Sequence, residues 1–349
     1  FRSVRARRLV LLLLALVLSG CAGVDTEPLP GKPSHHVAGG FRNPSPEFRR
    51  PDGWTRFTFF VRRGWQALAA ARSYDAPRVD NDGRALREAG GGPSVTWVGP
   101  ATLLVQVDGV NMLTDPHWGP RASPMSWAGP RRLSAPGLAF ESLPPIHLVL
   151  ISHDHYDHLD LGTVTRLART HDPLFVVPLG LKRWFADQGI TRVEELDWWQ
   201  STEHGGLRLI CAPAQHFSQR TLWDGNTRLW ASWMVLAPSR RFYFGGDSGY
   251  FSGFKEAGDR YGPFDLAAIA IGAYVPASIM RLTHTTPEEA FQASLDLRAR
   301  VMLAIHWGTF DLADEPLDEP PKRLRTEVDR RGLPPERAWV FRLGETRRW

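Results

Sequence analysis

Three histidines and three aspartates lie within the eight residues 153–160. The segment follows an apolar run and precedes an apolar pattern typical of a helix, which predicts that a strand ends where the polar cluster begins. Burying these side chains without a counter-ion is unfavourable, and a divalent metal ion removes that penalty. His153 and His155 alternate as in an extended loop and can converge on one ion, whereas Asp157 and His158 lie in the following turn and point to a neighbouring position. The spacing therefore predicts two metal positions.

Three further candidate ligands each follow a predicted strand. They are His216 after the strand 207–212, Asp247 after the strand 241–244, and His306 after the strand 301–305. A sheet can aim side chains from such strand ends at one point, although they are far apart in the sequence. The complete set of five histidines and two aspartates suits two zinc ions that share a carboxylate, because zinc prefers nitrogen and oxygen ligands. A solvated histidine-rich loop is the alternative for residues 153–160, but it does not explain the downstream candidates.

The elements that must position these residues alternate between strands and helices from residue 94 onward. Successive strands are expected at 95–98, 103–107, 110–113, 174–177, 207–212, 241–244, 266–271 and 301–305, and helices at 181–188 and 287–297. Asp108-Gly109, between two of these strands, predicts a tight hairpin turn. Strands followed by helices in two similar halves predict an α/β fold, a four-layer αββα sandwich in which helices cover two central sheets.

Composition and charge limit the class of partner. Hydrophobic residues make up 43% of the 349 residues and charged residues 23%, as in an ordinary globular protein. The net charge of +5 fits an anionic partner, either a phospholipid headgroup or a nucleic acid. The 14 tryptophans are numerous, and those in the segment 198–233 are either core residues or the lining of a groove for an acyl chain.

The N-terminal segment has the pattern of a bacterial export signal. Arginines precede the apolar run 9–18, which is too short to cross a bilayer, and Leu18-Ser19-Gly20-Cys21 follows. This sequence resembles the lipobox of bacterial lipoproteins, which implies that Cys21 carries a lipid anchor; ordinary secretory cleavage is the alternative. We therefore expect a membrane-anchored lipoprotein of the bacterial cell envelope, on the periplasmic or outer face. Because export separates the protein from RNA, we expect no nucleic-acid partner.

Three regions follow from these patterns. Residues 1–20 form the signal peptide, 21–93 a tether and amphipathic extension, and 94–349 the catalytic domain. The tether is rich in proline and glycine, and its His35 and His36 are expected to be solvated. Apolar residues recur at helical spacing over 54–71, with arginines between them. This helix is expected either to lie on an anionic membrane, or to pack on the catalytic domain or on a second subunit in a possible homodimer.

The pattern HxHxDH, with histidine, aspartate and histidine each after a later strand, resembles the metallo-β-lactamase superfamily. Within it, longer motifs are similar to the family of N-acylphosphatidylethanolamine-hydrolysing phospholipases D and its bacterial relatives. These motifs include Thr96-Trp97-Val98-Gly99, Leu113-Thr114-Asp115-Pro116, Gly246-Asp247-Ser248-Gly249-Tyr250 and Ala304-Ile305-His306-Trp307-Gly308-Thr309-Phe310. The resemblance covers about residues 94–325 and faintly includes Phe41-Arg42-Asn43-Pro44. One departure is Pro100, where the family usually has histidine, and it bears on substrate choice or on the tuning of the metal centre.

The resemblance implies a role for each candidate. By position it assigns His153, His155 and His216 to a first zinc ion, Asp157, His158 and His306 to a second, and Asp247 to both. A hydroxide between the two ions would attack phosphorus, with Asp157 and Asp247 as the carboxylates of the catalytic centre. His284 matches a family histidine near the active site and would bind the phosphate or protonate the leaving group; otherwise it caps the following helix. Asp115 would orient one of the ligand histidines.

The implied reaction is phospholipase D-type hydrolysis of N-acylphosphatidylethanolamine or a related glycerophospholipid. A lactonase or other carbonyl-ester hydrolase of the same fold is the main alternative, because two zinc ions and a hydroxide act equally well on a lactone. A non-catalytic zinc-binding lipoprotein is a further alternative. Export, the tryptophan-rich middle segment, the amphipathic segment 54–71 and the basic charge favour a phospholipid substrate.

Overall fold

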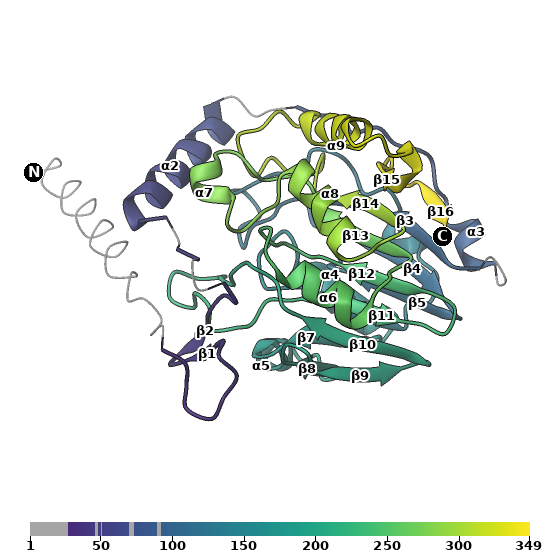
Figure 1. The fold of residues 1–349 in the computed structure, drawn as a ribbon, viewed down its shortest axis with the longest axis horizontal. Helices are drawn as coiled ribbons and strands as arrows, with labels where there is room; N and C mark the ends of the chain where they lie inside the picture. The colour runs from purple at the N-terminus through teal and green to yellow at the C-terminus, as the bar shows by residue number, and fades with distance from the viewer. Residues whose placement is uncertain (1–26, 46–47, 50, 70–72, 89–91) are drawn as a thin grey trace, which may run out of the picture.

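Two seven-stranded sheets form the centre of the molecule (Figure 1). The computed structural model describes residues 27–45, 48–49, 51–69, 73–88 and 92–349. The largest hydrophobic core contains inward-facing side chains from both sheets, such as Val105 and Val235. The two sheets therefore pack on one another, as the alternation of strands and helices predicted.

The first sheet is built from the N-terminal half of the catalytic domain and one C-terminal strand. Its order is β16-β3-β4-β5-β6-β7-β8. The strands are β3 (Ser94–Trp97), β4 (Leu103–Val107), β5 (Val110–Thr114), β6 (Leu148–Leu150), β7 (Leu174–Pro178), β8 (Val193–Leu196) and β16 (Thr346–Arg348). The hairpin between β4 and β5 is confirmed, with Val107 opposite Val110. Both turn residues, Asp108 and Gly109, have positive φ, as a two-residue hairpin turn of this kind requires.

The second sheet is built from the C-terminal half. Its order is β15-β14-β13-β12-β11-β10-β9. The strands are β9 (Ser201–His204), β10 (Leu207–Ala212), β11 (Ser232–Leu236), β12 (Arg241–Phe244), β13 (Leu266–Ala270), β14 (Val301–Ile305) and β15 (Ala338–Trp339). Strands β12 to β15 run parallel. Their carboxyl ends therefore lie at one edge of the sheet.

Helices cover the outer faces of both sheets and complete the four-layer order. α4 (Leu161–Thr170) and α5 (Leu181–Asp187) lie on the first sheet, and α6 (Gly253–Tyr261), α8 (Pro287–Asp296) and α9 (Glu319–Arg330) on the second. α4 begins at Asp160, whose carboxylate accepts a hydrogen bond from Thr163 N. α8 begins with a capping box between Thr286 and Glu289. The shorter elements are α3 (Arg84–Arg87), α7 (Ala277–Met280), η1 (Phe140–Ser142) and η2 (Pro335–Arg337).

The segment expected to be a tether contains a small hairpin, β1 (His36–Val37) and β2 (Gly40–Phe41). The expectation that His35 and His36 are solvated is wrong. Their Nε2 atoms each lie 2.6 Å from a different oxygen of Asp197, and only 7% of His35 is exposed. The ring of His35 also packs against Trp198, with 4.2 Å between centroids. The hairpin is therefore fixed to the catalytic domain.

The amphipathic helix is present as α2 (Gly53–Ala69) (Figure 1). It packs on the loop that follows β14: Arg63 Nη2 lies 2.6 Å from Asp311 Oδ1, and Phe59 is only 4% exposed. Trp54 and Val61 are exposed on the same helix. Among the residues that the structure describes, no helix is both long enough and apolar enough to cross a membrane. Cys21 lies outside the described residues.

The tryptophans of the middle segment belong mainly to the core. Trp198, Trp230 and Trp233 are buried, and each indole donates a hydrogen bond to a backbone carbonyl. A buried indole N–H needs such an acceptor, so these contacts fix each ring in place. The interpretation as the lining of an acyl groove is therefore wrong for these three residues. Trp223 is exposed on a loop.

Candidate metal centre

Seven candidate ligands meet between the two sheets, at the carboxyl ends of strands. Residues 153–158 follow β6, His216 follows β10, Asp247 follows β12 and His306 directly follows β14. Their nitrogen and oxygen atoms form two groups, within each of which all atoms lie within 4.8 Å of one another. The convergence expected from the positions of these residues after strands is therefore present.

The first group contains His153, His155 and His216. His155 Nδ1 lies 2.8 Å from His153 Nε2 and 3.1 Å from His216 Nε2. His153 and His216 are almost completely buried, whereas His155 is partly accessible. These three nitrogens come from two loops that are distant in sequence, and they face one common point.

The second group contains Asp157, His158, Asp247 and His306. His306 Nε2 lies 3.1 Å from His158 Nε2 and 3.2 Å from Asp157 Oδ2. Asp247 lies between the groups, because its Oδ2 is 3.1 Å from His158 Nε2 and 3.9 Å from His216 Nε2. This position is the one expected for a carboxylate shared by two metal ions.

The donor set fits metal ions better than it fits internal hydrogen bonding. Two imidazole nitrogens face each other where His158 Nε2 meets His306 Nε2. One of the two can donate a proton to the other, but that proton is then not available to any other acceptor nearby. Asp247 Oδ1 is buried, lies 3.3 Å from His306 Nε2, and has no hydrogen-bond partner among the described residues. Buried polar atoms are normally paired, so these atoms need a cation between them. Imidazole and carboxylate ligands suit zinc.

Partners outside the two groups orient the ligand histidines. The Asp115 carboxylate is completely buried and accepts hydrogen bonds from Ser152 N (2.7 Å), Ser152 Oγ (2.6 Å) and His158 Nδ1 (2.6 Å). His216 Nδ1 lies 2.9 Å from the Thr283 carbonyl, to which it must donate. In His158 and in His216 these contacts hold the proton on Nδ1, so the Nε2 lone pair is directed to the site. Asp115 lies where the sequence predicted an orienting residue.

The electrostatics of the site also call for a cation. Burial and the neighbouring His158 lower the pKa of His153 well below its usual value. Burial would lower the pKa of His158 too, but the carboxylates of Asp247, Asp157 and Asp115 outweigh it and raise that pKa. Burial raises the pKa of Asp247, yet the surrounding histidines hold it well below the usual range. Ionised carboxylates in a buried site need positive charge beside them, and a divalent ion provides it.

His284 lies beside this cluster. Its Nδ1 is 3.9 Å from Asp247 Oδ2 and has no hydrogen-bond partner in the described part of the chain, and its ring centroid is 5.1 Å from that of His216. Burial lowers the pKa of His284 to about 4. The alternative role as a helix cap is wrong, because Thr286 caps α8. The structure thus places a buried imidazole directly beside Asp247 and His216.

Sequence reasoning missed Asn43 as a residue of this site. Its Nδ2 donates a 2.7 Å hydrogen bond to the carbonyl of His216, and its side chain is buried. The faint family similarity of Phe41-Arg42-Asn43-Pro44 was the only signal in the sequence. Pro100, the departure from the family pattern, contributes its carbonyl, which accepts a 2.6 Å hydrogen bond from His306 N. Any residue at position 100 can make this backbone contact, so the proline preserves it.

Comparison with known proteins agrees with the site. The family model described as a β-lactamase superfamily domain matches residues 110–307, which include all seven candidate ligands. This match defines the class of protein. The chain is 44% identical over 248 residues to the N-acyl-phosphatidylethanolamine-hydrolyzing phospholipase D 1 of Caenorhabditis elegans, covering 68% of this chain and 70% of that protein. It is 31% identical over 258 residues to the mitochondrial phospholipase D of the same description from Saccharomyces cerevisiae, covering 72% of this chain and 55% of that one.

The chain therefore belongs to the family of N-acylphosphatidylethanolamine-hydrolysing phospholipases D and their relatives within the metallo-β-lactamase superfamily, a class of metal-dependent hydrolases. It spans between about half and 70% of the length of these two relatives. Among solved structures, an isothiocyanate hydrolase from Delia radicum gut bacteria has the same fold, with a TM-score of 0.60 and 19% identity, covering 73% of this chain and 98% of that chain.

Proposed function

We propose that this protein is a dinuclear zinc phosphodiesterase that hydrolyses a glycerophospholipid, with N-acylphosphatidylethanolamine as the favoured substrate. Cleavage of the distal phosphodiester bond would give phosphatidic acid and an N-acylethanolamine. The observation that carries the proposal is the position of Asp247 between two groups of histidines and aspartates, which is an arrangement for two adjacent ions. The choice of substrate is supported by the names of the C. elegans and yeast relatives.

The chain's own residues divide the work of such a site. His153, His155 and His216 would hold one ion, and Asp157, His158 and His306 the other, with Asp247 between them. Asp115 and the Thr283 carbonyl keep two of these histidines in the tautomer that presents Nε2 to the site. When bound, two zinc ions would supply an activated water at neutral pH and stabilise negative charge on the phosphate oxygens.

His284 is the remaining side chain of the proposed site that is not assigned as a metal ligand. Its Nδ1 lies close to Asp247 and has no hydrogen-bond partner among the residues that the structure describes, so it could bind a phosphate oxygen or pass a proton toward the leaving alkoxide. A neutral imidazole can donate through its protonated nitrogen at pH 7, and burial keeps His284 neutral there. We therefore include His284 among the catalytic residues.

The proposed location follows from the N-terminal pattern alone. Cys21 in Leu18-Ser19-Gly20-Cys21 would carry the lipid that holds the enzyme at the envelope membrane, next to its phospholipid substrate. A Cys21→Ser protein should lose metabolic labelling by fatty acid. Labelling that survives this substitution would refute the anchor without affecting the proposed reaction.

The reaction is tested by incubating zinc-loaded protein with N-acylphosphatidylethanolamine, with unacylated phosphatidylethanolamine and with a panel of lactones, and identifying the products by mass spectrometry. Phosphatidic acid together with N-acylethanolamine is the expected result. Diacylglycerol would show cleavage on the other side of phosphorus. Turnover of lactones alone would assign the protein to the carbonyl hydrolases of this fold.

A further inference from the structure

His306 differs from the other candidate ligands in the environment of its outward ring nitrogen. The outward nitrogens of three of the other histidines contact a serine hydroxyl, a carboxylate and a backbone carbonyl. The Nδ1 of His306 is buried and has no hydrogen-bond partner among the described residues. A metal-binding histidine almost always donates this hydrogen to a carboxylate, a carbonyl or a water molecule. A partner for Nδ1 is therefore needed to complete the site.

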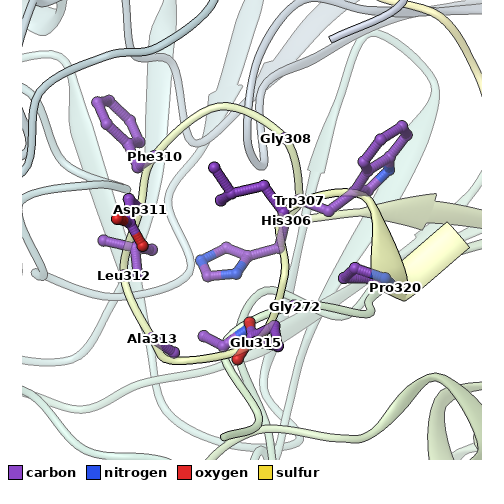
Figure 2. A pocket seen from close by; sticks show the side chains of 12 residues that line it. Gly272, His306, Trp307, Gly308, Phe310, Asp311, Leu312, Ala313, Glu315 and Pro320 are labelled. Carbon is purple, nitrogen blue, oxygen red and sulfur yellow. The ribbon is translucent and has the colours of Figure 1, made fainter. Parts of the chain in front are cut away.

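A small cavity lies beside His306 (Figure 2). The space available to the centre of a water molecule is about 20 Å³, which is enough for one water. Most of its walls are apolar, among them Phe310, Leu312 and Ala313. Glu315 contributes a carboxylate to this lining, although only 8% of the residue is exposed. Glu315 and His306 thus both line a space that can hold one water molecule.

Glu315 is held firmly in this position. Its two carboxylate oxygens accept hydrogen bonds from Ala273 N (2.6 Å) and Val275 N (3.1 Å). A carboxylate presents about four lone-pair sites, so an acceptor with several partners can still accept a hydrogen bond from a water molecule. The backbone on both sides of the cavity is also constrained, because Ala273 and His306 have φ values of 64° and 62°, which non-glycine residues seldom adopt. Such conformations persist only where the surroundings fix them.

We propose that Glu315 positions His306 through one water molecule bound in this cavity. His306 Nδ1–H would donate to the water, and the water would donate to the Glu315 carboxylate. His306 would then present its Nε2 lone pair to the point shared by Asp157, His158 and Asp247. The inference rests on the proposed role of His306 as a metal ligand, but not on the identity of the substrate.

Two substitutions test the proposal by different routes. Glu315→Gln removes the carboxylate, but its amide would also face a backbone N–H and disturb the loop 272–275. Ala313→Val leaves Glu315 intact and fills the cavity with two methyl groups, which displaces the water. Ala299→Val is the matched control, because Ala299 is equally buried and precedes the opposite end of β14.

Zinc affinity is measured on the metal-free proteins by competition with a chromogenic chelator. We expect the weaker of two zinc equivalents to lose about tenfold in affinity in Glu315→Gln and in Ala313→Val, as for other partners of ligand histidines, and to change less than twofold in the control. A crystal structure of the zinc-loaded wild-type protein should show a water within hydrogen-bond distance of His306 Nδ1 and Glu315.

Unchanged affinity in Ala313→Val, or a dry cavity in the crystal structure, would overturn the inference. If Glu315→Gln fails to fold, the valine variant alone decides. Wild-type protein that binds two zinc ions and contains this water, yet does not hydrolyse phospholipid, would refute the proposed substrate and leave the role of Glu315 standing.

Discussion

Two buried clusters of histidine and aspartate in the described part of the chain differ in how completely their polar atoms are paired. In the N-terminal cluster, His35 and His36 each contact a separate oxygen of Asp197, and the backbone N–H of Trp198 donates to the same carboxylate. In the candidate metal centre, ring nitrogens face other ring nitrogens, and Asp247 Oδ1 has no hydrogen-bond partner within the described ranges. Both clusters bring their atoms close enough to hold an ion.

The difference shows that proximity of histidine and aspartate does not by itself indicate a metal. The N-terminal cluster is complete without an ion, since two imidazole donors meet one carboxylate with two acceptor oxygens. It joins the β1–β2 hairpin to the catalytic domain. The candidate metal centre is incomplete without a cation. We therefore assign a structural role to the first cluster and a metal-binding role to the second.

The largest expected effect is the loss of activity in Asp247→Asn. Asparagine cannot supply the negative charge that two adjacent cations share, so activity on phospholipid should fall about 100-fold or more, with reduced zinc content. Zinc is measured by elemental analysis of the purified protein. Asp197→Asn is the matched variant in the other cluster and should retain full zinc. Normal turnover and a normal zinc content in Asp247→Asn would show that the two clusters do not differ in metal binding as we propose.

The second effect concerns stability. Asp197→Asn places an amide N–H₂ opposite one of the two imidazole donors of His35 and His36, so a charged acceptor and its hydrogen bonds are lost. The free energy of unfolding should fall by about 2 kcal/mol, a typical value for hydrogen bonds to a partly buried charged group. Urea unfolding followed by tryptophan fluorescence measures it. A variant as stable as the wild type would mean that the hairpin contributes nothing to the fold.

The third effect links the N-terminal segment to the site. Asn43→Ala removes the hydrogen bond that holds the His216 carbonyl, and we expect about a tenfold loss of zinc affinity or of activity. Asn81→Ala is the control, because Asn81 Nδ2 also donates a 2.8 Å hydrogen bond to a backbone carbonyl, that of Gly344. Equal losses in the two variants would indicate a general effect on folding.

The smallest effect is a pH dependence of the N-terminal cluster. Burial raises the pKa of Asp197, but the hydrogen bonds from His35 and His36 outweigh it and hold that pKa below the ordinary value of 3.8. The stabilisation is therefore complete above pH 3.8 and is lost as the pH falls through the lower pKa of the folded state. The stability difference between wild type and Asp197→Asn should shrink in that window. A difference that grows on acidification would contradict this assignment.

The sequence was sufficient to predict the seven candidate ligands and the layered fold. The ligands lie in a short motif or directly after apolar strands. The carboxyl ends of parallel strands meet at one edge of a sheet, whatever the conformation of the loops that follow them. The predictions of the ligands and of the fold needed only local pattern and the geometry of sheets. The orienting role of Asp115, which follows β5, came from the family resemblance.

The remaining features depend on contacts between distant segments. His35 and His36 read as solvated because their partners, Asp197 and Trp198, are 161 or more residues away. The side chains of Asn43 and Glu315 contact backbone groups, which carry no residue type that a sequence pattern could identify. Such partners become visible only when the chain is folded.

The candidate ligands come from both sheets, so metal binding affects how long the folded protein survives. One loop of the site follows β6 of the first sheet, and the other ligands follow β10, β12 and β14 of the second. Bound ions would thus act as removable cross-links between the two halves of the catalytic domain. Free metal at 100 times the dissociation constant adds about 2.7 kcal/mol to the stability of a protein with one such site. When metal is scarce, the protein would therefore become more sensitive to proteolysis as well as lose its activity.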